Sequence, residues 1–155
     1  MLTFNKLGRY GRTANQMFQI AGTIGLATKH GYDFAFPEWK NWDEKERFSG
    51  TDDINMQEWF KNPLPLYEGD ELPEHNIPWG FREYTTIPDN VSLLGHMQSE
   101  KYFLHCKDLI KHYFEFKNET PKRTNTIAVH FRGGDYGGNY HPTCTREYYE
   151  KARRS

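Results

Sequence analysis

Hydrophobic and polar positions in the first part of the chain change from a strand-like to a helix-like spacing. Residues 1–5 predict a short strand, and residues 6–12 a loop rich in Gly and Arg. A helix is predicted from Thr13, which has capping-box spacing with Gln16, to a stop at Gly31. Its apolar face consists of Met17, Phe18, Ala21, Ile24 and Ala27.

The pattern then becomes irregular before it returns to order. Residues 32–36 alternate polar and aromatic side chains, which predicts a second strand closed by Pro37. Residues 38–86 predict a loop-rich insertion with prolines, acidic clusters and all four tryptophans. The tryptophan rings would either cover the core or stack on sugar faces. Residues 91–97 predict a strand and residues 99–116 a helix. The side chains expected to face inward from this helix are Tyr102, Phe103, Cys106, Leu109, Ile110 and Tyr113.

The last part of the chain predicts one more strand and one more helix. After a linker at residues 121–124, the apolar run 126–131 predicts a buried strand that ends in a Gly133-Gly134 turn. A helix is expected from about Thr145. Alternating strands and helices indicate a parallel α/β sheet, in which ligands gather at the carboxyl ends of the strands. Both glycine loops would lie at such ends.

Composition narrows the classes of partner. The net charge of −1, from 20 basic and 21 acidic residues, gives no general field that would attract nucleic acid, so an anion site must be local. No stretch approaches the roughly 20 apolar residues of a membrane span, so we expect a cytoplasmic protein; peripheral membrane association stays open. Cys106 and Cys144 lack C-x-x-C spacing, which argues against a zinc site and a disulfide framework.

The strongest local motif is His130-Phe131-Arg132-Gly133-Gly134-Asp135-Tyr136. Its glycines would let backbone N–H groups approach an anion, and the Arg132 guanidinium would match two phosphate oxygens. The motif therefore predicts a phosphate site. The alternative is a tight turn with a surface pair between Arg132 and Asp135.

A second motif runs from Gly8 to Gln16 and places arginines and two amides at a helix N-terminus. Arg12, Asn15 and Gln16 could there bind an anion or sugar hydroxyls, because free N–H groups and the helix dipole favour such ligands. The alternative is a capped core helix. The sequence matches neither a Walker loop nor the dinucleotide glycine fingerprint.

Three ordered strings, residues 11–19, 95–103 and 130–136, together resemble signatures of the α-1,2-fucosyltransferases, glycosyltransferase family 11. The string Gln98-Ser99-Glu100-Lys101-Tyr102-Phe103 is the most specific of them. His141-Pro142 and the later Tyr148-Tyr149 are similar as well, so the resemblance extends to about Ala152.

This resemblance implies a GT-B architecture of two Rossmann-like domains. Residues 1–120 would form the acceptor-side domain, with the insertion at 38–86, and residues 121–155 the linker and only the first strand and helix of the donor domain. The implied reaction transfers fucose from GDP-fucose to a galactose hydroxyl with inversion, as part of glycan biosynthesis. No metal or other cofactor is implied, and the partners are the sugar nucleotide and an acceptor glycan.

The resemblance also implies roles for single residues. Arg132 would hold the donor diphosphate and stabilise charge as GDP leaves. From its position beside the predicted phosphate turn, Asp135 would act as general base or only orient Arg132, and His130, on the predicted strand, is either a proton acceptor or a satisfied core residue. The residues expected to bind substrate are Arg12, Asn15, Gln16, Gln98, Glu100, Lys101, Gly133, Gly134 and Tyr136.

Two departures from the family pattern affect this prediction. Gly133 stands where a second arginine is usual, and Ala14 replaces a glycine before the Asn-Gln pair. Family members are also longer than this chain. The alternative function is therefore a truncated, non-catalytic relative that binds a carbohydrate or a nucleotide.

Overall fold

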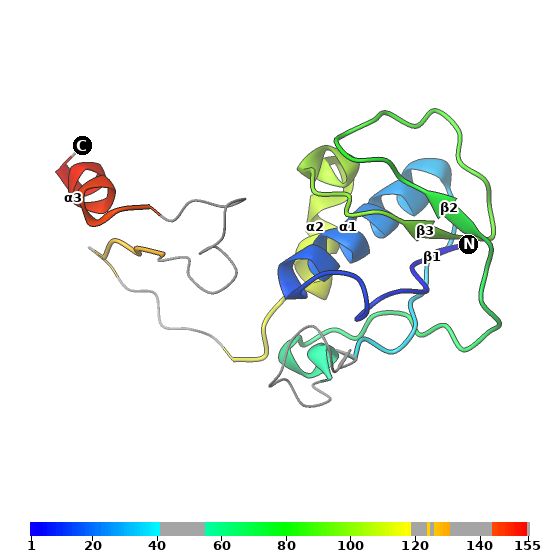
Figure 1. Ribbon diagram of the computed structural model, residues 1–155. Helices are drawn as coiled ribbons and strands as arrows, with labels where there is room; N and C mark the ends of the chain where they lie inside the picture. Colours follow the sequence, from blue (N-terminus) through cyan, green and yellow to red (C-terminus); the bar gives the residue numbers. More distant parts are fainter. Residues whose placement is uncertain (41–54, 119–123, 125, 131–143, 155) are drawn as a thin grey trace. The chain divides into compact units, whose positions relative to one another are not determined.

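The computed structural model describes residues 1–40, 55–118, 124, 126–130 and 144–154. The chain divides into two compact units, Met1–Glu119 and Thr120–Ser155. Among the described residues no helix is both long and apolar enough to cross a membrane. Figure 1 shows the helices and strands of the larger unit.

A parallel sheet forms the centre of unit 1. Its strands β1 (Leu2–Thr3), β2 (Glu74–Asn76) and β3 (Val91–Leu94) lie in the order β1-β3-β2. Leu2 pairs with Val91, and Glu74 pairs with Ser92, both in parallel register. The unit is thus a small α/β structure of the kind found in a Rossmann-like fragment. This confirms the predicted parallel α/β class, whereas the two-domain GT-B arrangement stays a prediction.

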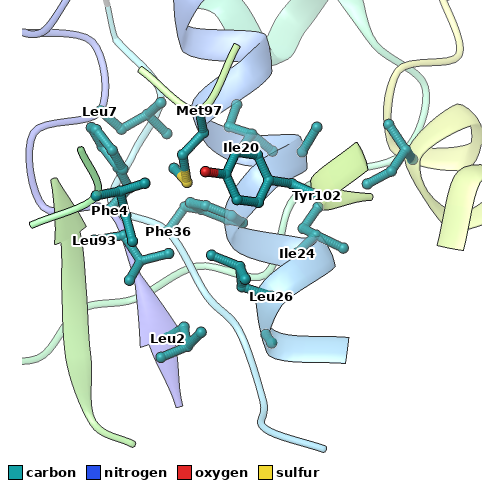
Figure 2. Packing of buried hydrophobic residues seen from close by; sticks show 14 of the residues in the cluster. Leu2, Phe4, Leu7, Ile20, Ile24, Leu26, Phe36, Leu93, Met97 and Tyr102 are labelled. Carbon is teal, nitrogen blue, oxygen red and sulfur yellow. The ribbon is translucent and has the colours of Figure 1, made fainter. Parts of the chain in front are cut away.

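Helix α1 (Thr13–His30) packs against this sheet. Figure 2 shows Ile20 and Ile24 of α1 facing the apolar side chains of β1 and β3, where all are buried. Gly31 ends the helix in the left-handed conformation with φ 70°, which confirms the predicted stop. The predicted capping box is wrong. Arg12 occupies the N-cap without a side-chain cap hydrogen bond, and the Gln16 amide is engaged elsewhere.

Two glycines bring α1 unusually close to the segment that follows β3. A Cβ atom on Gly25 would lie 2.2 Å from the carbonyl oxygen of Tyr102, and one on Gly22 would lie 2.8 Å from the Met97 sulfur. The helix therefore touches the backbone of this segment directly. Figure 2 shows Met97 and Tyr102 packed over α1.

Several boundaries differ from the prediction. Residues 32–36 form only isolated bridges, one of them between Leu2 and Phe34, and β2 lies inside the predicted loop-rich insertion. The strand expected over 91–97 ends at Leu94, because the chain turns at Gly95. β2 escaped detection because its Glu-His-Asn sequence carries no apolar alternation.

The predicted helix 99–116 is interrupted. Two 3₁₀ turns, Glu100–Tyr102 and Leu104–Cys106, precede the short helix α2 (Lys107–Tyr113). Phe103 separates the two turns with φ −132° and ψ 7°, outside the helical region. The inward face was predicted correctly. The residues buried in the core or packed against it are Tyr102, Phe103, Cys106, Leu109, Ile110 and Tyr113.

The tryptophans of the insertion have different environments. Trp39 is buried and stacks on Phe60 with ring centroids 5.5 Å apart. Trp59 and Trp79 remain 52% and 77% exposed. Trp42 lies outside the described residues. The predicted core-covering role is thus confirmed for Trp39.

Unit 2 contains helix α3 (Arg146–Arg154), which confirms the helix expected from about Thr145. The predicted buried strand is wrong for residues 126–130, which are exposed and form no strand. Ile127 is 78% exposed, because no described strand of this unit pairs with the segment and no apolar layer covers it.

Both cysteines, Cys106 in unit 1 and Cys144 in unit 2, are free thiols.

Candidate functional site at the carboxyl edge of the sheet

A cavity of about 430 Å³ opens where the strands of unit 1 end. One wall is the segment 77–80, which follows β2, and the other is the segment 95–98, which follows β3. Tyr10, from the loop between β1 and α1, completes the lining. In parallel α/β sheets ligands bind outside the carboxyl ends of the strands, so this cavity occupies the position expected of a site.

Close backbone approach sets the shape of the cavity. The Ile77 N–H donates to the Leu94 carbonyl at 2.8 Å, and a Cβ on Gly95 would lie 2.4 Å from the Ile77 carbonyl oxygen. Any larger residue at position 95 would push the two walls apart. Met97 adopts φ 48°, which is uncommon for a residue other than glycine. Met97 is buried against Gly22, and both His96 and Met97 line the cavity.

Three aromatic rings dominate the cavity. The His96 ring lies 4.6 Å from the Tyr10 ring, stacked at 23°, and 4.6 Å from the Trp79 ring, tilted at 42°. Nδ1 of His96 is buried without a hydrogen-bond partner among the described residues. Burial lowers the pKa of His96 below its ordinary value, so the imidazole is neutral at pH 7.

The backbone that follows Trp79 is held in place by hydrogen bonds to the Tyr102 side chain. The Tyr102 hydroxyl donates to the Gly80 carbonyl at 3.2 Å and accepts from the Arg82 N–H at 3.1 Å. Tyr102 itself is buried in the core beside α1 (Figure 2). The cavity wall is therefore anchored to the fold at a residue of the most specific sequence string.

The structure joins two of the predicted site residues at the rim of this cavity. The Gln98 amide nitrogen donates to the Asn15 side-chain oxygen at 2.6 Å. Gln98 also lines the cavity. Gly11 has φ 84°, and a Cβ there would lie 2.8 Å from Asn15, so the glycine lets the loop fold closely over the helix start. The strings 11–19 and 95–103 thus meet in space.

The other predicted residues of unit 1 lie in different surroundings. Gln16 is fully buried, donates to the Gly11 carbonyl at 2.8 Å and accepts from the Trp39 indole at 2.7 Å. Arg12 is the N-cap of α1. Lys101 lies 5.3 Å from the Phe81 ring and lines a separate cavity.

Glu100 is exposed in the first 3₁₀ turn. It does not line the cavity at the carboxyl edge.

Little of the predicted phosphate motif falls on described residues. His130 is exposed, and its carbonyl accepts a hydrogen bond from the Tyr149 hydroxyl at 3.3 Å. Arg132, Gly133, Gly134, Asp135 and Tyr136 lie outside the described residues, so their roles stay predictions.

Sequence reasoning did not select Tyr10 or His96 as site residues, and it considered Trp79 only as one of four tryptophans that could stack on a sugar or cover the core. His96 lay inside a recognised string and Trp79 in an irregular segment, but only the fold shows that their rings meet. Within the described ranges, no three His, Cys, Asp or Glu side chains are grouped so that they could hold a metal ion.

Comparison with curated proteins agrees with the resemblance seen in the sequence. The chain is 32% identical over 78 aligned positions to an α-1,2-colitosyltransferase of Escherichia coli, covering 41% of this chain and 27% of that protein. It is a distant, partial homologue of an α-1,2-glycosyltransferase. The match thus spans about a quarter of the relative's length. No protein-family model and no solved structure matches the chain.

Proposed function

We propose that this chain acts as an inverting, metal-independent glycosyltransferase that moves fucose from GDP-fucose to a galactose-type hydroxyl in α-1,2 linkage. The single observation that carries the proposal is the similarity to an α-1,2-colitosyltransferase. The juxtaposition of the strings 11–19 and 95–103 through Asn15 and Gln98 supports it. The cytoplasmic location expected from the sequence belongs to the same proposal.

The proposal assigns the donor diphosphate to Arg132. A guanidinium can donate two parallel hydrogen bonds to phosphate oxygens, and a fixed cation stabilises the charge that develops as GDP leaves. Asp135 would remove the acceptor proton or orient Arg132. His130 is the second candidate for the base.

A non-catalytic relative that binds carbohydrate or nucleotide is the second candidate function. Gly133 favours it, because a glycine in place of a second arginine removes one charge-assisted contact to phosphate. This candidate predicts saccharide or GDP binding without turnover.

The test is GDP release from GDP-fucose with lactose as acceptor, repeated with GDP-colitose because the relative is named for colitose. Arg132→Ala should lower kcat by about 100-fold or more, the usual loss when a charge-stabilising donor is removed. Arg146→Ala is the matched control, since Arg146 is an exposed arginine of the same unit that pairs with Glu150. It should leave the rate unchanged.

The outcomes separate the two functions. Full activity in Arg132→Ala would contradict the phosphate assignment. GDP binding by calorimetry without GDP release would favour the non-catalytic relative. A higher rate with GDP-colitose would keep the transferase and correct the donor sugar.

A further inference from the structure

We propose that the cavity at the carboxyl edge is a subsite for one neutral sugar ring of the acceptor glycan, held by Trp79 on its apolar face and by His96 and Gln98 on its hydroxyls. The assignment of that ring to the acceptor rests on the proposed function. The binding of a neutral saccharide to this cavity rests on the geometry of unit 1 alone.

The charge of the cavity indicates the class of ligand. Its described lining contains no Lys, Arg, Asp or Glu side chain, and the residues are Tyr10, Asn76, Ile77, Pro78, Trp79, Gly80, Leu94, Gly95, His96, Met97 and Gln98. A diphosphate requires cations or several converging N–H donors. A neutral ligand that combines hydroxyls with C–H faces suits this lining better. The volume of about 430 Å³ falls in the range usual for small-molecule sites.

Trp79 provides the apolar surface. Its ring contacts His96 yet stays 77% exposed, so most of the indole is available to a ligand. Aromatic rings bury large apolar area, and the C–H face of a pyranose is flat enough to stack on one. An indole left this exposed on the wall of a cavity contributes little to the stability of the fold. Its position is therefore better explained by a ligand than by core packing.

The wall that carries Trp79 is preorganised. Before Trp79, the Ile77 N–H is bonded to Leu94, and after it the Gly80 carbonyl is bonded to the buried Tyr102 hydroxyl. Fixing both sides of the ring in advance reduces the entropy lost when a ligand binds. Trp59, another exposed tryptophan of the insertion, lines a separate cavity and does not line the cavity at the carboxyl edge.

The polar groups are suited to hydroxyls. A neutral imidazole has one donor and one acceptor nitrogen. His96 Nδ1 lies beneath the surface, so Nε2 is the nitrogen through which this ring can bond a ligand. Gln98 uses its amide nitrogen on Asn15, which leaves its carbonyl oxygen for a hydroxyl donor. Small-molecule sites commonly combine an aromatic or apolar lining with a few such polar groups.

The test uses saturation-transfer NMR and tryptophan fluorescence titration of the whole chain with lactose. Trp79→Ala should weaken lactose binding at least tenfold, whereas Trp79→Phe, which keeps an aromatic face, should weaken it less. His96→Phe keeps the ring contacts but loses the hydrogen bond, and we expect about a fivefold loss. Trp59→Ala is the matched control and should change the Kd less than twofold. Circular dichroism verifies the fold of each variant.

Failure of this proposal and failure of the transferase give different results. Absence of lactose binding, or equal affinity in Trp79→Ala and wild type, would overturn the subsite even if GDP release proceeds. Trp79-dependent lactose binding without GDP release would keep the subsite and remove the transferase. Displacement of lactose by GDP alone, lost in Trp79→Ala, would show a nucleotide in the cavity and overturn the assignment.

Discussion

Replacing Gly25 by alanine tests the contact that positions the segment after β3. The added methyl would lie 2.2 Å from the Tyr102 carbonyl oxygen and 2.8 Å from the Phe103 Cα, and both atoms belong to the backbone. The helix or the 3₁₀ turn would have to move by roughly 1 Å. Overpacking of this kind costs about 3 kcal/mol, and the better helix propensity of alanine returns about 1 kcal/mol. We therefore expect the free energy of unfolding to fall by about 2 kcal/mol.

Urea unfolding followed by circular dichroism measures this loss, and Gly22→Ala is the matched control. Gly22 lies in the same helix, but its added methyl would meet the Met97 side chain, with the sulfur 2.8 Å away. The thioether can move aside more easily than a backbone carbonyl, whereas the Met97 Cβ, 2.9 Å from the added methyl, cannot, so this variant should lose about 1 kcal/mol, less than Gly25→Ala. The reasoning is refuted if Gly25→Ala is as stable as wild type, or if Gly22→Ala loses more free energy of unfolding than Gly25→Ala.

Two further predictions concern buried polar groups. Trp39→Phe keeps a ring against Phe60 but leaves the Gln16 side-chain oxygen without its indole donor, so urea unfolding should show a loss of about 1 to 3 kcal/mol; an unchanged midpoint would contradict this. Burial lowers the pKa of His96 in the folded chain below 6.5. As pH falls through 6.5, His96 therefore takes up a proton in the unfolded chain first, and the free energy of unfolding declines until the folded pKa is passed. His96→Phe should reduce the decrease in Tm between pH 7.5 and 5.5; an equal decrease in both proteins would show that other groups cause it.

The sequence predicted the elements whose apolar spacing was long and regular. Helix α1 and its end at Gly31 followed from a periodic face and a glycine, and the inward face of residues 99–116 was also correct. Short elements were harder. β2 is only Glu74–Asn76, and its polar sequence gives no period-2 pattern, since its place in the sheet comes from backbone pairing with β3.

The sequence missed features that are determined by contacts between segments far apart in the chain. The helix predicted over 99–116 is interrupted at Phe103, where the backbone lies against Gly25 of α1. The Gln16 amide joins the Gly11 loop to Trp39 in the core, and the sequence did not reveal these contacts; its role in substrate binding stays a prediction. No local pattern contains such information.

The candidate site shows the same division. The sequence predicted Asn15 from its place at a helix N-terminus and Gln98 through a resemblance, and the hydrogen bond between them is a contact across 83 positions of the chain. It did not identify the cavity wall, because Trp79 looks like one of four tryptophans in an irregular segment. Its distinct position arises only where β2 and β3 end side by side.

One string, residues 95–103, links the fold to the candidate site. Gly95 allows the two walls to approach, Met97 and Tyr102 belong to the core, and His96, Met97 and Gln98 line the cavity. Within this string Met97 adopts the left-handed conformation with φ 48°, which is uncommon for a residue other than glycine. Strain of this kind persists only where the surrounding packing fixes it, here through the contact of Met97 with Gly22 of α1. A change that loosens the helix contact should therefore also disorder the cavity, even though α1 supplies none of its lining.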